Sequence, residues 1–196
     1  MKKYIFATLL LFILSGVVHA QQKNSVARFR SINSIGLLSG QSQTTFTMQS
    51  INGIKYKSWF AGLGVGLDTY GYRSIPAFAD IRKSFGKQSW QAFVYADGGI
   101  NFPLYSSELP RKLYGNDAYK LYNTFYGEAG IGFNKPITKK TTFILSAGFS
   151  YKHFSYLDYN YYNSPFIFIV GGTQAPQSSE YNFYYRRIAV KMGIAF

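Results

Sequence analysis

The sequence predicts an all-β fold, an antiparallel eight-stranded transmembrane up-and-down β-barrel. Most of the chain consists of segments in which apolar residues alternate with small or polar ones, as in a strand between lipid and a polar lumen. Aromatic residues make up 19% of the chain, with 18 Tyr and 18 Phe against 2 Trp, and Tyr suits the boundary between water and lipid. The final strand ends on Phe196.

The N-terminus has the composition of a secretory signal peptide. A pair of lysines precedes an apolar run over residues 4–14, which is too short to span a bilayer comfortably. Val18 and Ala20 supply the small residues of a cleavage site. We therefore expect residues 1–20 to be removed and residues 21–196 to form one barrel domain.

Eight segments carry the alternation and are predicted to be strands: 28–39, 43–51, 58–70, 73–85, 90–102, 121–134, 141–156 and one from about residue 180. The first two are the weakest, because the parity of Ile35, Leu37 and Leu38 is ambiguous. In the third, glycines alternate with residues such as Leu63 and make room for large side chains that point inward. In the fourth, Pro76 is compatible with a strand end or a bulge.

The last strand assigns one face to lipid and the other to the lumen. Its outward apolar stripe consists of Ile188, Val190, Met192, Ile194 and Phe196. The opposite stripe includes Arg187 and Lys191, which then point inward. Closure of this strand onto the first removes the exposed edges of the sheet.

An even number of strands places both termini in the periplasm. The two longest connections, 103–120 and 157–179, then lie outside the cell. The short connections, near 52–57, 86–89 and 135–140, lie in the periplasm. Long outer loops and short periplasmic turns are typical of outer-membrane barrels.

The second long connection contains an apolar run over residues 165–170 that ends in a Gly-Gly pair. We expect this run to pair with residues 181–185 as a hairpin. If it is exposed instead, it is a candidate surface contact, since exposed apolar patches mark interactions. The residues of that contact are Phe166, Ile167, Phe168 and Ile169.

The lumen of an eight-stranded barrel is just wide enough for side chains, so a continuous pore is not expected. The charges assigned to it by parity are Asp68, Asp80, Arg82, Asp97, Glu128, Arg187 and Lys191. Charges in a narrow interior must be paired, and both signs are present. We predict a polar plug in which Glu128 pairs with Arg187 or Lys191. A catalytic carboxylate pair is the less favoured interpretation.

Composition excludes several other classes. The chain has 0 Cys, so disulfides, thiolate metal sites and a lipoprotein anchor are ruled out. No later apolar stretch is long enough for a transmembrane helix. The glycines at positions 62–66 lie inside a strand and do not form a phosphate loop. No cofactor or metal site is predicted. A soluble Tyr-rich β-sandwich is the alternative fold class.

The formal charge of +13 comes from dispersed basic residues without a nucleic-acid recognition motif, so nucleic-acid binding is not expected. Lysines near the short connections could meet inner-leaflet phosphates. They are Lys55, Lys57, Lys87, Lys135, Lys139 and Lys140. Arg111, Lys112 and Lys120 lie on the other side and could meet lipopolysaccharide phosphates.

The alternating stretches 61–68, 73–80 and 92–102, together with the signal and the terminal Phe196, resemble the small outer-membrane β-barrel family. That family includes the outer membrane protein A transmembrane domain and outer membrane protein X. The first two stretches are similar to barrel-domain proteins common in Bacteroidetes. The resemblance implies a place in the outer membrane of a Gram-negative bacterium. It also implies that the barrel assembly machinery reads the terminal Phe and its apolar stripe.

A His-x-Ser arrangement, His153 and Ser155, lies near the outer end of the seventh segment and resembles that of outer-membrane lipid A deacylases. Activation of a Ser by a His needs both on one face, which this spacing provides. The deacylase motif continues with Asn where this chain has Tyr156. Glu180 is the only Glu that follows the pair. An interfacial His in an aromatic rim is the preferred interpretation.

These observations predict a non-enzymatic outer-membrane barrel with a structural or surface-interaction role. Its long outer loops would meet lipopolysaccharide or an unidentified extracellular ligand. The first alternative is a narrow, porin-like channel for small solutes. The second is a lipid A-modifying enzyme.

Overall fold

The structure is a computed structural model, and it describes residues 27–86, 90–104, 119–160 and 177–196. The predicted signal peptide lies outside these residues. The strands are β1 Ala27–Gly40, β2 Thr44–Tyr56, β3 Trp59–Asp68, β4 Ser74–Phe85, β5 Gln91–Pro103, β6 Tyr119–Tyr122, β7 Thr124–Pro136, β8 Thr142–Asn160 and β9 Gln177–Ala195. Within these ranges, no helix is long and apolar enough to cross a membrane.

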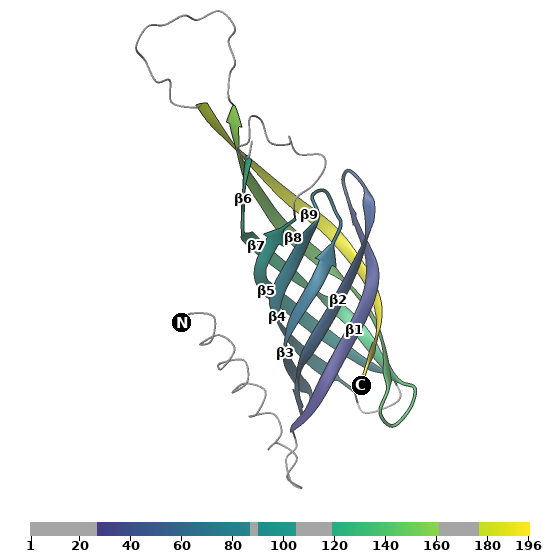
Figure 1. Cartoon of the computed structure of the whole chain (residues 1–196). Coiled ribbons are helices and arrows are strands. Elements are labelled where there is room, and N and C mark those ends of the chain that lie inside the picture. Colours follow the sequence, from purple (N-terminus) through teal and green to yellow (C-terminus); the bar gives the residue numbers. More distant parts are fainter. Residues whose placement is uncertain (1–26, 87–89, 105–118, 161–176) are drawn as a thin grey trace, which may run out of the picture.

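The strands form one closed antiparallel barrel (Figure 1). Closure joins the first strand to the last, with Ile32 opposite Ala195 and Gly40 opposite Arg187. Strands β6 and β7 both pair with β8 and together make one wall of the barrel. The predicted eight-stranded antiparallel barrel is therefore confirmed.

The wall made by β6 and β7 contains a bulge. Tyr122 lies opposite Ser155 and Tyr126 opposite Lys152, so three residues of one strand face two residues of β8. A bulge bends its strand and redirects nearby side chains, often beside functional sites. The alternation of the sixth segment did not indicate this bulge.

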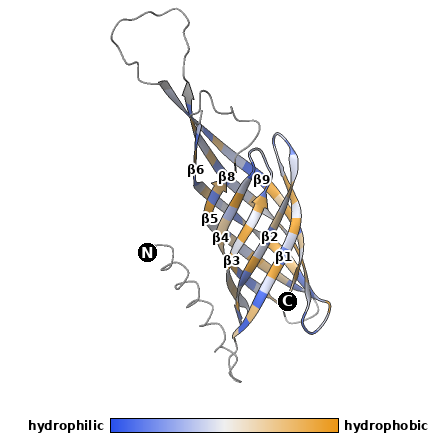
Figure 2. Ribbon diagram, viewed as in Figure 1, coloured by the Kyte–Doolittle hydropathy of each residue, from blue (hydrophilic) through white to orange (hydrophobic). Residues whose placement is uncertain are grey.

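The alternation of the sequence becomes an outward apolar face and a buried inward face. Leu63 is 73% exposed and Ile131 61% exposed, whereas the inward Phe78 and Phe93 are 4% and 2% exposed. Apolar and polar residues alternate along the strands in Figure 2. In a membrane barrel the outward residues meet lipid, so their exposure to solvent in the isolated chain is expected.

Two glycines of the inward face leave room for aromatic rings. A Cβ atom on Gly64 would lie 2.5 Å from the Phe78 ring, and one on Gly132 would lie 2.4 Å from the Phe93 ring. Real Cβ atoms do not approach other atoms so closely. The glycines thus allow large rings to fill the interior, as the spacing of the third segment predicted.

The turns are shorter than expected at one end of the barrel. Strand β2 continues to Tyr56, so the connection predicted at 52–57 is wrong and only Lys57 and Ser58 form the turn. Lys57 has a φ of 53°. Likewise, Lys135 and Pro136 belong to β7. The alternation runs on through these residues, and tight turns let the ladders extend to the rim.

The hairpin of β8 and β9 projects beyond the rest of the barrel (Figure 1). Residues 181–185 pair with residues 152–156 of β8, so the predicted pairing of 181–185 with 165–170 is wrong. The physical reason is that β8 and β9 stay in register well past the rim. The candidate contact residues 166–169 lie outside the described residues.

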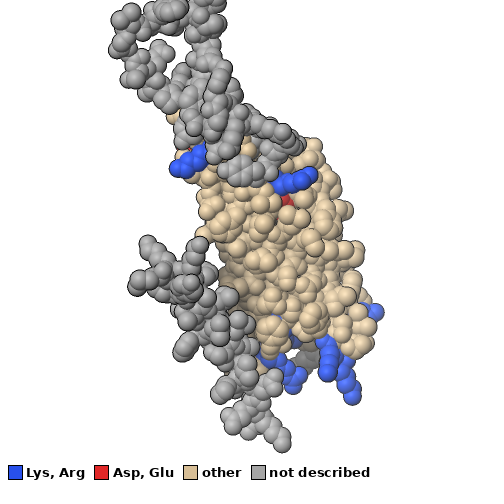
Figure 3. Space-filling model, in the orientation of Figure 1, with Lys and Arg blue, Asp and Glu red and all other residues tan. Residues whose placement is uncertain are grey.

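Basic side chains gather at the two ends of the barrel face seen in Figure 3, with an uncharged band between them. At the end opposite the hairpin, the ammonium of Lys83 lies 4.4 Å from the Trp59 ring centre, and that of Lys135 lies 4.9 Å from the Trp90 ring centre. Aromatic rings and lysines of this kind mark the edge of a lipid-facing band.

Candidate functional site

The seven charges assigned to the lumen all lie inside the barrel and are at most 9% exposed. They form three groups, which we call the mouth group, the central group and the Asp80 group. The mouth group is nearest the hairpin. The pairing of these charges decides whether the lumen is blocked.

The mouth group is built around Asp68, which is 1% exposed. Its carboxylate contacts the Arg187 guanidinium and lies 3.2 Å from the Lys152 ammonium. It also accepts a hydrogen bond of 2.9 Å from the backbone N–H of Tyr70. Arg187 donates in addition to the Ser150 hydroxyl at 2.7 Å. One carboxylate thus holds two cations from different strands.

Lys152 was not among the predicted lumen residues, although the parity of its strand placed it inward. Its ammonium donates to the backbone carbonyl of Tyr70 at 2.7 Å and to that of Tyr72 at 2.9 Å. These carbonyls belong to the turn between β3 and β4. Lys152 therefore fastens that turn to the far wall of the barrel.

The central group pairs Glu128 with Lys191 in direct contact. Glu128 also accepts hydrogen bonds from the hydroxyls of Tyr95 at 2.6 Å and Tyr126 at 3.0 Å. The Gln49 side chain accepts from Lys191 at 2.8 Å and donates to Tyr126 at 3.0 Å. The five side chains form a closed network across the lumen. Of the two partners expected for Glu128, the structure brings it to Lys191.

In the Asp80 group, Arg82 donates from Nε and Nη2 to the Asp80 carboxylate at 2.8–3.0 Å. The guanidinium also lies 5.4 Å from the Phe93 ring centre. Asp97 stands between Asp80 and Glu128 in the strand register. Neither of its carboxylate oxygens has a hydrogen-bond donor among the described residues.

An apolar cluster occupies the interior around these charges. Its buried members are Ile32, Ile51, Phe60, Phe78, Phe93, Tyr95, Tyr126, Ile144 and Ala195. They come from all eight walls, so rings and aliphatic chains from opposite sides meet inside the barrel. Side chains of this size fill a lumen as narrow as that of an eight-stranded barrel.

A second polar site lies on the outer wall, at the bulge of β6 and β7. It is a pocket of about 780 Å³ lined by Gly99, Ile100, Tyr122, Asn123, Thr124, Phe125, His153, Ser155, Glu180 and Asn182. The pocket therefore contains the His-x-Ser pair and the Glu that follows it in the sequence. It also contains Asn182, which the sequence did not single out.

The hydrogen bonds of this pocket do not link the His to the Ser. The Ser155 hydroxyl donates to Glu180 at 3.3 Å, and His153 Nε2 lies 2.9 Å from the Asn182 side-chain oxygen. The His153 ring also stacks on Tyr184, with 4.7 Å between ring centres. A nucleophilic Ser needs a base that accepts its proton. Here the Ser155 hydroxyl donates to the Glu180 carboxylate and not to the His153 imidazole.

Aromatic rings line the inner face of the projecting hairpin. Tyr72 stacks on Phe154 with 4.3 Å between ring centres, and Tyr156 stacks on Tyr181 at 5.1 Å. Burial, together with neighbouring Tyr72 and Tyr181, raises the pKa of Tyr156 above its ordinary value. Phe154 is fully buried in this stack, whereas Tyr181 is 41% exposed.

The outward stripe of β9 is exposed along its length, as the alternation indicated. Its members are 46–61% exposed: Ile188, Val190, Met192, Ile194 and Phe196. The backbone of Phe196 exchanges two hydrogen bonds with Ser31, at 2.8 and 3.0 Å. The terminal residue is thus part of the seam between β1 and β9. The described residues hold no cluster of three or more His, Cys, Asp or Glu suited to a metal ion.

No protein-family model and no curated protein sequence matches this chain. Among solved structures, it is similar to Neisserial surface protein A, with a TM-score of 0.50 and 11% identity over 89% of this chain and 98% of that one. It is also similar to the N-terminal β-barrel domain of Pseudomonas aeruginosa OprF, with a TM-score of 0.48 and 10% identity over 89% and 100% of the two chains. The outer membrane protein AlkL gives a TM-score of 0.48 and 11% identity over 90% and 92%. The expected resemblance to small outer-membrane barrels is confirmed for the fold.

Proposed function

We propose that this protein is an integral barrel of the bacterial outer membrane with a blocked lumen and a structural or surface-interaction role. The observation that carries the proposal is the set of buried interior charges, in which Asp68 and Glu128 are held by ion pairs to cations of other strands. A lumen crossed by such pairs and packed with aromatic rings offers ions no continuous water path.

The surface role rests on the projecting hairpin. Its two strands carry aromatic side chains, of which Tyr181 is 41% exposed and Tyr184, stacked on His153 at the outer wall, is 60% exposed. Exposed Tyr rings are suited to contacts with carbohydrate or protein because they have an apolar face and a polar tip. We propose that the hairpin and the long outer connections meet lipopolysaccharide or an extracellular ligand. Loss of cell binding in a variant with Tyr181→Ser and Tyr184→Ser would support this role.

Conductance in planar bilayers tests the blocked lumen. We expect the barrel without residues 1–20 to insert without discrete current steps. A variant with Phe78→Ala and Phe93→Ala is the matched control, because it removes two interior rings and leaves the outer face unchanged. Discrete openings of the unmodified chain would overturn the proposal and favour a narrow solute channel.

Export and assembly are part of the same proposal. A signal peptide over residues 1–20 would direct the chain to the periplasm, and the barrel assembly machinery would read the outward stripe of β9. Deletion of Phe196 should then lower the amount of folded barrel in outer-membrane fractions. Met192→Ala is a control inside the same stripe that leaves the terminal residue in place. Normal assembly without Phe196 would contradict the assembly signal.

One observation favours the enzymatic alternative: His153, Ser155 and Glu180 share one pocket on the outer wall. The absence of a His–Ser hydrogen bond in the described pocket weighs against it. Mass spectra of lipid A from cells with the unmodified protein and with Ser155→Ala decide the question. We expect identical spectra. An acyl chain that is lost with the unmodified protein and retained with the variant would establish the enzyme.

A further inference from the structure

The outward face of β1 and β2 carries an island of polar side chains in an otherwise apolar band. Asn33 lies opposite Ser50 in the register, and Ser31 lies opposite Asn52. The row on the hairpin side of this island is Ile35 and Met48, and the row on the other side is Phe29 and Ile54. All four of these apolar residues are 45–62% exposed. Asn33, Ser50 and Asn52 therefore lie inside the lipid-facing band, while Ser31 beside them is only 7% exposed.

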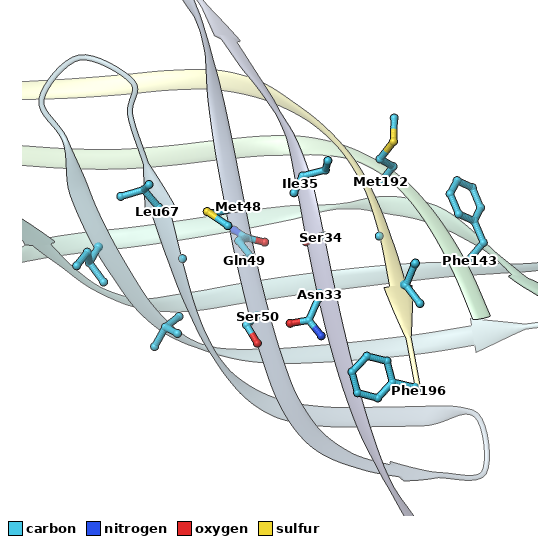
Figure 4. A pocket seen from close by; sticks show the side chains of 15 residues that line it. Asn33, Ser34, Ile35, Met48, Gln49, Ser50, Leu67, Phe143, Met192 and Phe196 are labelled. Carbon is cyan, nitrogen blue, oxygen red and sulfur yellow. The ribbon is translucent and has the colours of Figure 1, made fainter. Parts of the chain in front are cut away.

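Two residues of the island, Asn33 and Ser50, line an apolar pocket of about 820 Å³. Figure 4 shows Asn33 and Ser50 side by side on its floor, with Ile35 and Met48 on one side and Phe196 on the other. Asn33 and Ser50 are smaller than most of the side chains around them, so the outer surface is hollowed at this place. Small residues at such a place allow two membrane segments to approach closely.

The Asn33 amide is short of hydrogen-bond partners. An amide has two N–H donors and a carbonyl oxygen that accepts two bonds. Among the described residues its one hydrogen bond runs from Nδ2 to the Ser31 hydroxyl, at 3.5 Å. Lipid tails can neither donate nor accept, so polar groups in the lipid-facing band are costly unless another protein surface satisfies them.

The opposite wall of the barrel shows that the island is not required by the fold. The outward residues there are Val94, Ala96, Gly98 and Ile100 of β5 and Ala129, Ile131 and Phe133 of β7. This set contains no polar side chain. The polar groups are therefore concentrated on one side of the barrel, where a partner could bind.

We propose that the β1–β2 face binds a second copy of this chain within the membrane. A two-fold axis through the island would place the Asn33 amide of one copy opposite the Asn33 amide of the other. An amide carries both donor and acceptor, so the same side chain can satisfy itself across such an axis. The apolar rows around the island would then pack against their counterparts. This dimer is independent of whether the lumen conducts.

Cysteine cross-linking tests the dimer directly, because the unmodified chain has 0 Cys. Ile35→Cys places a thiol at the edge of the island and leaves Asn33 intact. Ile131→Cys is the matched control, since Ile131 is also exposed but lies on the opposite wall. In lipid vesicles at a high lipid-to-protein ratio, we expect a cross-linked dimer from Ile35→Cys and none from Ile131→Cys.

The second arm removes the polar groups. Asn33→Leu with Ser50→Ala, added to Ile35→Cys, should reduce the cross-linked fraction severalfold. Heat-modifiable migration on gels verifies that each variant is a folded barrel. Equal cross-linking at the two sites would show random collision and overturn the proposal. Absence of cross-linking from folded Ile35→Cys, as expected if a lipid chain occupies the pocket, would also overturn it.

Discussion

Two aspartates inside the barrel, Asp68 and Asp97, have opposite surroundings. Asp68 contacts two cations and a backbone N–H, and its carboxylate is the centre of the mouth group. Asp97 has no hydrogen-bond donor among the described residues and stands between two other acids, Asp80 and Glu128. Both are buried, so burial alone does not tell which charge stabilises the barrel. The number of hydrogen-bond and ion-pair partners distinguishes the two aspartates.

The difference assigns the groups different roles. The mouth group joins the β3–β4 turn to strands on the far side of the lumen, so it braces the end of the barrel that carries the hairpin. Asp97 adds a third carboxylate where Arg82 and Lys191 are already paired with Asp80 and Glu128, so it has no ion pair of its own among the described residues. We therefore expect removal of the carboxylate charge to change the free energy of unfolding by different amounts at Asp68 and Asp97.

The largest effect is expected from Asp68→Ala. The substitution leaves the Lys152 and Arg187 cations buried without their common carboxylate. Breaking one side of a buried ion pair costs about 3–5 kcal/mol. Urea unfolding in lipid vesicles, followed by tryptophan fluorescence, measures the free energy of unfolding. A loss below about 1 kcal/mol, as found for exposed pairs, would contradict the bracing role.

An intermediate effect is expected from Lys191→Ala. Glu128 loses its cation but keeps the hydroxyls of Tyr95 and Tyr126. The expected loss is about 2–3 kcal/mol, in the range of a hydrogen bond to a charged group. Insertion should be normal, because the outward stripe of β9 is unchanged. A loss as large as that of Asp68→Ala would mean that the two hydroxyls contribute little.

The smallest effect is expected from Asp97→Asn. The substitution removes a charge without a donor and relieves the repulsion from Asp80 and Glu128. The free energy of unfolding should change by less than about 1 kcal/mol or increase, since no charge-assisted bond is lost. The same unfolding measurement applies. A clear loss of stability would show that the ionised Asp97 has a partner that its surroundings do not reveal.

The side of the sheet on which each residue lies could be predicted from the sequence, because alternation has a period of two. Parity placed Asp68, Glu128 and Lys191 inward, as the structure has them. The choice of partner could not be predicted. Glu128 reaches Lys191 across the lumen, and their relative height depends on the tilt and stagger of the strands, which parity does not encode.

The composition of the outer pocket could not be predicted from parity either. Parity placed His153 and Ser155 on one face, but Glu180 joins them only through the β8–β9 register and the bulge at 123–125. A bulge is one extra residue in a ladder, and nothing in the alternation marks it. The hairpin is a few residues longer than predicted, because β8 continues to Asn160 instead of ending at residue 156 and β9 begins at Gln177 instead of near residue 180.

The seam between β1 and β9 has a consequence for the order of folding. It joins the two ends of the described chain, down to the hydrogen bonds between Ser31 and Phe196. Local hairpins can form early, but contacts between residues so far apart in sequence form slowly, because closing a long loop costs entropy. The barrel therefore stays an open sheet until β9, already paired with β8, pairs with β1. During that interval the edges of β1 and β9 are both unpaired and must be shielded from other chains.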